Sequence, residues 1–261
     1  MNNNQARTIA YIVFVLSVLL SACGGLATEA PTGTPQPTAT KTLVPTATST
    51  ATRTPRPTRT PNPTPTDWVD AYEVELQTYI DLGYLPSAEG RFVRYEGLNR
   101  AWAQLGWYQR WTQDDVARNF FMSAHFKWSS AYRNADESGC GFVFATQEND
   151  DHYAVFLDWR RVTFIVYDSA SYYARRVGLT RGTGSVKFVN PADQPAEADF
   201  TLIVNDAYAY VLVNGEVVGE YTLSQSKILK GKLGITMISG TNKDYGTRCE
   251  MTDVHAFIIN D

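Results

Sequence analysis

The chain has 261 residues, of which 44% are hydrophobic and 13% aromatic, and its formal net charge is −4 at pH 7. Residues 67–261 carry 18 Lys and Arg against 26 Asp and Glu, which gives this part a net charge of about −8. Binding of nucleic acid depends on a basic surface that neutralises phosphates, so the charge balance argues against a nucleic-acid partner.

The N-terminal residues have the pattern of an export signal. A polar start containing Arg7 precedes an uncharged apolar run at 9–20, which is too short to span a bilayer comfortably. The following segment, Leu20-Ser21-Ala22-Cys23-Gly24, resembles the lipobox of bacterial lipoproteins. The resemblance implies that a signal peptide, residues 1–22, is removed and that Cys23 is lipidated. The alternative is an ordinary secretory signal with an incidental cysteine.

A lipid on Cys23 implies attachment to a membrane. Two or more hydrocarbon chains on one cysteine are enough for a stable anchor. We therefore expect the membrane to be a partner through Cys23, and the chain to lie on the extracytoplasmic face or surface of a bacterial cell.

Residues 23–66 form the next predicted segment, rich in Thr and Pro. Nine of the twelve prolines fall between Pro31 and Pro65. Proline cannot donate to a β-ladder, and so few apolar residues cannot form a core. We expect a disordered tether that can reach on the order of 100 Å at roughly 3 Å per residue.

Residues 67–261 are expected to form one globular domain that begins with a helix at 67–83. Asp67 is placed to cap its start and Gly83 to end it. The apolar positions are spaced to form one stripe: Val69, Tyr72, Leu76, Tyr79 and Ile80.

From Trp107 onward, short runs rich in β-branched and aromatic residues alternate with turn residues, which is typical of a sandwich or barrel. Asn214-Gly215 predicts a type I′ hairpin turn, and slipped alternation at Thr252-Asp253 predicts a bulge. The predicted strands are 107–111, 119–128, 140–147, 152–158, 162–168, 173–178, 185–189, 198–205, 207–213, 217–223, 231–238 and 248–259.

Four stretches occur in the order found in concanavalin A-like jelly rolls: GCGFVFATQENDDHYAVFLD, EADFTLIVNDAYAYVLVNGEVVGEY, GKLGITMIS and CEMTDVHAFII. They resemble the laminin-G-like branch and the domain family named for 3-keto-disaccharide hydrolase. The resemblance implies an all-β fold, an antiparallel two-sheet jelly roll. Such folds host lectins, hydrolases and adhesion modules alike, so it implies no particular activity.

Cys140 and Cys249 are the two cysteines that remain after lipidation of Cys23. In an oxidising exterior, an isolated even pair is most simply a disulfide. The alternative is two free thiols.

The sequence contains no recognisable catalytic motif. The paired acids of laminarinase-like enzymes, a G-x-S-x-G elbow and closely spaced histidines are all absent. We assign no catalytic residue and no cofactor, and favour a protein that is not an enzyme. Calcium is a weaker possibility in the loop 148–151, through Glu148, Asp150 and Asp151.

Aromatic side chains are more numerous than a core strictly requires, and sugar rings stack on such faces. Strand alternation nevertheless points half of them inward. The candidates for a ligand-binding face are Trp128, Trp159, Tyr167, Tyr172 and Arg175.

We therefore favour a tethered, non-catalytic jelly roll that binds carbohydrate or another cell-envelope polymer. One alternative is a glycoside hydrolase-type enzyme on the same fold. Another is a structural or protein-interaction module, in which the helix at 67–83 is either a cover on one sheet or a docking element.

Overall fold

The computed structural model describes residues 65–224 and 230–260. The predicted signal peptide, Cys23 and the Thr/Pro tether lie outside these residues. In the described part of the chain, no helix is both long enough and apolar enough to cross a bilayer.

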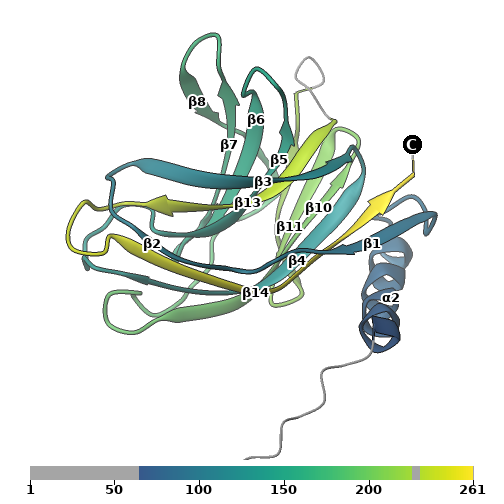
Figure 1. Cartoon of the computed structure of the whole chain (residues 1–261), viewed down its shortest axis with the longest axis horizontal. Coiled ribbons are helices and arrows are strands. Elements are labelled where there is room, and N and C mark those ends of the chain that lie inside the picture. The colour runs from purple at the N-terminus through teal and green to yellow at the C-terminus, as the bar shows by residue number, and fades with distance from the viewer. Residues whose placement is uncertain (1–64, 225–229, 261) are drawn as a thin grey trace, which may run out of the picture. The chain divides into compact units, whose positions relative to one another are not determined.

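Two antiparallel sheets form a sandwich, as the sequence predicts (Figure 1). The larger sheet has eight strands in the order β1-β14-β4-β10-β11-β12-β9, with β2 also paired to β14. Its strands are β1 (Gly90–Arg94), β2 (Leu98–Trp102), β4 (Phe120–Ser130), β9 (Leu179–Gly182), β10 (Ala196–Asn205), β11 (Tyr208–Val213), β12 (Glu216–Thr222) and β14 (Thr247–Ile259).

The smaller sheet has six strands in the order β3-β13-β5-β6-β7-β8. Its edge strands are therefore β3 and β8. The strands are β3 (Trp107–Ala117), β5 (Gly139–Thr146), β6 (His152–Leu157), β7 (Val162–Asp168), β8 (Tyr173–Arg176) and β13 (Gly231–Ser239).

The core lies between the sheets and is built from the inward half of each alternating strand. Phe126 and Phe200 of the larger sheet meet Phe142 of the smaller one, with ring centroids 4.9–5.5 Å apart. The predicted disulfide is present: Cys140 of β5 and Cys249 of β14 are fully buried, with Cα atoms 5.7 Å apart. This covalent bond joins the two sheets through the core.

Both local features predicted for the strands are confirmed. Asn214 and Gly215 have φ angles of 52° and 80°, the positive values of a type I′ turn between β11 and β12. In β14 the pairing with β4 shifts between Thr252 and His255, and Asp253 has a φ of 52°. This is the bulge expected near Thr252-Asp253.

Other strand predictions need correction. Residues 185–189 form no strand; Ser185 makes one isolated bridge, while Val186 and Phe188 pack against the core from a loop. Their apolar alternation reflects that packing and not a ladder. Strands β1, β2 and β9 were not predicted, because their residues are mostly exposed and lack an apolar alternation.

Helix α2 (Pro65–Asp81) covers the outer face of the larger sheet. It begins two residues before the predicted start, at a proline, which is tolerated in the first turn because its missing N–H has no partner there anyway. Beyond its end, Gly83 takes a φ of +75°. Leu76 and Tyr79 of the predicted stripe pack on Phe121, Phe257 and other outward residues of the sheet.

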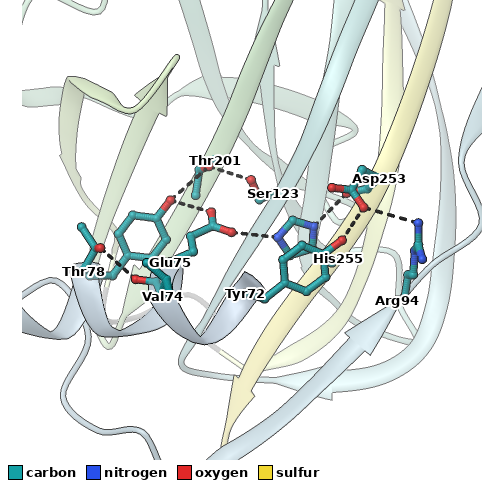
Figure 2. A network of polar contacts seen from close by, with 10 residues as sticks. Tyr72, Val74, Glu75, Thr78, Arg94, Ser123, Thr201, Asp253 and His255 are labelled. Carbon is teal, nitrogen blue, oxygen red and sulfur yellow. Dashed lines mark hydrogen bonds and ion pairs between the residues drawn. The ribbon is translucent and has the colours of Figure 1, made fainter. Parts of the chain in front are cut away.

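A polar network also joins α2 to the sheet (Figure 2). The Glu75 carboxylate accepts a hydrogen bond from the Tyr79 hydroxyl at 2.7 Å and lies 2.9 Å from His255 Nε2. The His255 ring donates from Nδ1 to the Asp253 carbonyl at 2.8 Å and stacks on the Tyr72 ring at 3.7 Å. The apolar stripe of α2 is thus buried against the larger sheet, so the helix is a packed cover and not a free docking element.

Candidate binding site

The smaller sheet curls so that opposite corners of its outer face approach each other. Gln109 in β3 lies in one row with Met237, Cys140 and Leu157 across β13, β5 and β6. Tyr108 is next to Gln109, so in a flat sheet it would lie close to this row. His152 is five residues from Leu157, which is about 17 Å along the strand from the same row. Tyr108 nevertheless lies 2.8 Å from His152, measured from Oη to Nε2. A flat sheet cannot make this contact, whereas a twisted and coiled one can.

Small residues on the middle strands permit this close approach. Gly141 of β5 has no room for a side chain, because an added Cβ would lie 2.1 Å from the Val155 carbonyl oxygen in β6. Gly234 of β13 is similarly close to the Trp111 carbonyl oxygen, at 2.3 Å. The Tyr108 ring extends over these strands to Phe156, with ring centroids 5.4 Å apart.

The curled face encloses a hollow of about 460 Å³, which we call the aromatic hollow. Two of its aromatic side chains are largely exposed: Trp107, at the start of β3, is 62% exposed, and Tyr172, in the turn between β7 and β8, is 86% exposed. They come from opposite edges of the sheet. The hollow is lined by Gly106, Trp107, Tyr108, Arg110, Asp150, His152, Tyr167, Tyr172 and Ala174.

A connected polar group lies in the aromatic hollow. Arg110 forms an ion pair with Asp150 and lies 3.2 Å from His152 Nε2. Tyr108 donates its hydroxyl proton to Nε2, and Nδ1–H of His152 donates to the Asp150 carbonyl at 2.6 Å. Burial, assisted by the Arg110 charge, lowers the pKa of His152 to about 4. The ring is therefore neutral at pH 7, and Arg110 and Asp150 carry the local charges.

Two residues of the hollow have left-handed backbones, which cost energy for any residue other than glycine. The φ angle is 81° at Asp150 and 52° at Tyr172. The turn that carries Tyr172 is held in place by Asp151, whose Oδ1 accepts hydrogen bonds from both the backbone N–H and the hydroxyl of Ser169 at 2.8 Å. The exposed Tyr172 ring is thus presented on a fixed turn.

A second hollow, of about 450 Å³, adjoins the first at Arg110 and Asp150. Most of its lining residues have polar side chains, and they come from the far ends of β3, β5 and β13 and from the turn between β5 and β6. The residues are Arg110, Thr112, Val116, Thr146, Gln147, Glu148, Asp150, Lys230, Gly231 and Lys232. The two hollows therefore adjoin, with the exposed aromatic side chains in the first and the charged side chains mainly in the second.

The structure brings together two of the five predicted ligand-binding residues, Tyr167 and Tyr172. Trp128 was wrongly predicted: it is 1% exposed, because the alternation of β4 points it into the core, where its ring meets Phe188. Trp159 lies in the β6–β7 turn, away from the lining of the hollow, with the Arg160 guanidinium 3.9 Å from its ring centroid.

Arg175 does not line the aromatic hollow. It pairs in β8 with Val166 of β7, whose side chain packs against the core, so the two residues share the opposite face of the sheet from Tyr167. Its neighbour Ala174 lines the hollow instead.

Sequence reasoning missed Trp107, Tyr108, Arg110 and His152 as members of one site. Residues 108 and 110 share a strand face, which the alternation of β3 does indicate. No signal in the sequence relates them to His152 of β6, because that contact depends on the curl of the sheet.

The acids proposed for calcium do not converge. Asp150 is engaged by Arg110 and Asp151 by Ser169, while Glu148 lines the second hollow. Within residues 65–224 and 230–260, no group of three or more His, Cys, Asp or Glu side chains is arranged to hold a metal ion.

Asp158 is the carboxyl group whose acidity the fold perturbs most among the described residues. It is 3% exposed, and burial raises its pKa to about 7. Its Oδ1 accepts a hydrogen bond from the Trp159 N–H at 2.6 Å. Asp158 therefore holds the turn between β6 and β7 and does not face either hollow.

No protein-family model matches the sequence, and no curated protein matches it. Similar solved structures include a carbohydrate-binding module, CBM66, from Bacillus subtilis, with 9% identity and a TM-score of 0.44 over 66% of this chain and 99% of that one. A Bacillus subtilis protein of unknown function with a galectin-like fold has 14% identity and a TM-score of 0.41 over 66% and 89% of the two chains.

A β-fructofuranosidase from Aspergillus kawachii has 14% identity and a TM-score of 0.41 over 67% of this chain. The matched part is 28% of that enzyme. At these identities and TM-scores, the similarities carry no argument about what this chain binds.

Proposed function

We propose that the sandwich is a non-catalytic carbohydrate-binding domain whose ligand sits in the aromatic hollow. The observation that carries the proposal is the pair of exposed rings, Trp107 and Tyr172, on either side of a hollow that also contains Arg110 and Asp150. The apolar faces of sugar rings stack on aromatic side chains, and a few fixed polar groups orient the hydroxyls. The aromatic hollow offers both.

The chemistry of the hollow suits binding better than hydrolysis. Asp150 is the single carboxylate among its lining residues, and it is paired with Arg110. Glycoside hydrolysis ordinarily needs two carboxyl groups on either side of the scissile bond. The arrangement supports a ligand that is held without being cleaved.

We further propose that the domain is displayed outside the cytoplasmic membrane by a lipid on Cys23, with residues 24–66 as the spacer. The apolar run, the lipobox-like segment and the Thr/Pro composition support this. In a bacterial host, the chain should sediment with membranes, and Cys23→Ser should release it. Membrane association that is unchanged by Cys23→Ser would exclude the lipid anchor.

The binding proposal is tested on a glycan array with the full chain and two variants, Trp107→Ala and Tyr172→Ala. Each should weaken binding about tenfold or more, since loss of one stacking contact costs on the order of 1 kcal/mol beyond the lost buried area. Tyr208→Ala is the matched control, because Tyr208 is 55% exposed on the other sheet. Equal binding by all four proteins would reject the aromatic hollow, and binding to no glycan would reject the function.

A further inference from the structure

A separate hollow lies at the open side of the sandwich, and we propose that it is a second sugar-binding site. It has a volume of about 400 Å³ and is lined by Glu96, Gly97, Leu98, Asn99, Arg100, Trp111, Gln113 and Ile235. None of these residues lines the aromatic hollow or its polar extension. We call it the lateral hollow.

The lateral hollow exists because two edge strands face each other across the gap between the sheets. Among the described strands, β2 pairs with β14 alone and β3 with β13 alone. Strand alternation places Tyr108 and Arg110, which line the aromatic hollow, on the outer face of β3, whereas Trp111 packs toward the core. One edge strand therefore contributes aromatic side chains to two different hollows.

Polar side chains point into the lateral hollow from both walls. In β2, Arg100 lies opposite Cys249, whose side chain is in the core, so Arg100 is on the inward face of the strand. From β3, Gln113 lies two residues beyond Trp111, on the same face. Trp111 is half-buried, and its ring forms part of the lining.

The hydrogen-bonding groups of this hollow are unused within the described part of the chain. Within residues 65–224 and 230–260, the side chains of Glu96, Asn99, Arg100 and Gln113 make no hydrogen bond or ion pair. In contrast, Arg91 and Arg94 on the neighbouring strand β1 both have carboxylate partners. Unpaired donors and acceptors beside one indole ring are groups that can bind a polyhydroxylated ligand.

The lining chemistry favours a neutral sugar. One carboxylate and one guanidinium cancel in charge, and the Gln113 amide supplies both donors and an acceptor, which matches hydroxyl groups that donate and accept at once. The choice of a sugar rests on the proposed function; the presence of a second hollow does not. Two sites on either side of β3 would allow one polymer chain to bind with higher avidity than either site alone.

A structural explanation competes with this one. Inward-pointing charges on edge strands prevent edge-to-edge pairing with other molecules. On that explanation Glu96 and Arg100 only protect the edges of β2 and β3, and no sugar enters the hollow. The two explanations differ in whether the Trp111 ring senses a ligand.

The test follows tryptophan indole N–H signals by NMR in the full chain, with Trp107 and Trp111 assigned from Trp107→Phe and Trp111→Phe. The probes are cellohexaose, xylohexaose, laminarihexaose, mannohexaose, maltohexaose and a fructan of similar length. We expect at least one to shift the Trp111 signal, also in the double variant Trp107→Ala/Tyr172→Ala. Arg100→Ala removes a charged hydrogen bond, so the affinity measured from the Trp111 shift should fall about tenfold. The Trp107 signal should respond as in the unsubstituted chain.

Two outcomes would overturn the second site: a Trp111 signal that no probe moves, or a Trp111 shift that disappears in the double variant. Failure of the proposed function is separate, since it appears as a Trp107 signal that no probe moves. Arg118→Ala, which removes an exposed arginine paired with Asp206, is the matched control for Arg100→Ala. It should change neither signal.

Discussion

Tyr108 and His152 are hydrogen bonded at 2.8 Å although β13 and β5 lie between their strands. The contact places a neutral, buried imidazole at the centre of the aromatic hollow and fixes its tautomer through the Asp150 carbonyl. Curvature of the sheet, and not proximity along the chain, creates the site.

The lowered pKa of His152 predicts a loss of stability in acid. The unfolded chain takes up a proton near pH 6.5 and the folded chain only near pH 4, so the free energy of unfolding should fall as pH drops through this window. The full difference corresponds to about 3 kcal/mol. Urea unfolding at pH 7 and pH 4.5 should show a smaller pH effect in His152→Gln. His125→Gln, which removes a half-buried histidine next to Asp199, is the control and should keep the pH effect of wild type; equal pH effects in all three would contradict the assignment.

The raised pKa of Asp158 predicts a pH dependence of stability with the opposite sign. Its folded pKa of about 7 lies above the ordinary aspartate value of 3.8, so the stability present in acid is lost as pH rises from about 4 through 7. Asp158→Asn keeps an acceptor for the Trp159 N–H and cannot ionise. The variant should be more stable than wild type at pH 8 by up to about 4 kcal/mol, and similar at pH 4. A variant that is less stable at pH 8 in thermal unfolding would show that the charged form is favoured.

The disulfide should contribute much of the domain's stability. Cys140 and Cys249 are separated by 109 positions, and a loop of that size corresponds to about 4–5 kcal/mol on the chain-entropy model. Cys140→Ala/Cys249→Ala should lower the urea midpoint of the oxidised protein accordingly. Its midpoint should also not respond to dithiothreitol, and a double variant as stable as wild type would refute the contribution.

Helix α2 should depend on Glu75 for its position on the sheet. Removing one partner of a largely buried charged network costs roughly 3 kcal/mol or more. Glu75→Ala should therefore destabilise the domain and speed amide hydrogen exchange in residues 69–81. Glu73→Ala on the exposed side of the helix is the control and should change stability by no more than about 0.5 kcal/mol. Equal exchange rates in both variants would show that apolar packing alone holds the helix.

Tyr172 allows binding and strain to be separated. Glycine tolerates its φ of 52°, so Tyr172→Gly should be more stable than Tyr172→Ala by about 1 kcal/mol. Both variants lack the ring and should bind sugar equally weakly. If the glycine variant were the less stable in thermal unfolding, the turn would not be strained at this position.

The sequence was sufficient for features that depend on near neighbours. Alternation located most strands, Asn214-Gly215 identified a turn, and the apolar stripe from Tyr72 to Tyr79 identified the helix that covers a sheet. The cysteine pair was predicted from chemistry alone, without knowledge of which strands would meet.

The candidate binding residues were harder to predict, because burial and sheet curvature decide which side chains line a hollow. Trp128 and Tyr172 are both aromatic, yet the alternation of β4 points Trp128 into the core, whereas Tyr172 lies in a turn and is 86% exposed. Strands β1 and β2 lack apolar alternation, so the lateral hollow beside them could not be anticipated either.

The central claim is that sugar binds between Trp107 and Tyr172. The most direct measurement is a backbone amide chemical-shift titration of the full chain with the glycan that binds best on the array. The account predicts that the shifts centre on Trp107, Arg110, His152 and Tyr172. Shifts centred instead on the other sheet around Tyr208, with Trp107 and Tyr172 unmoved, would contradict it.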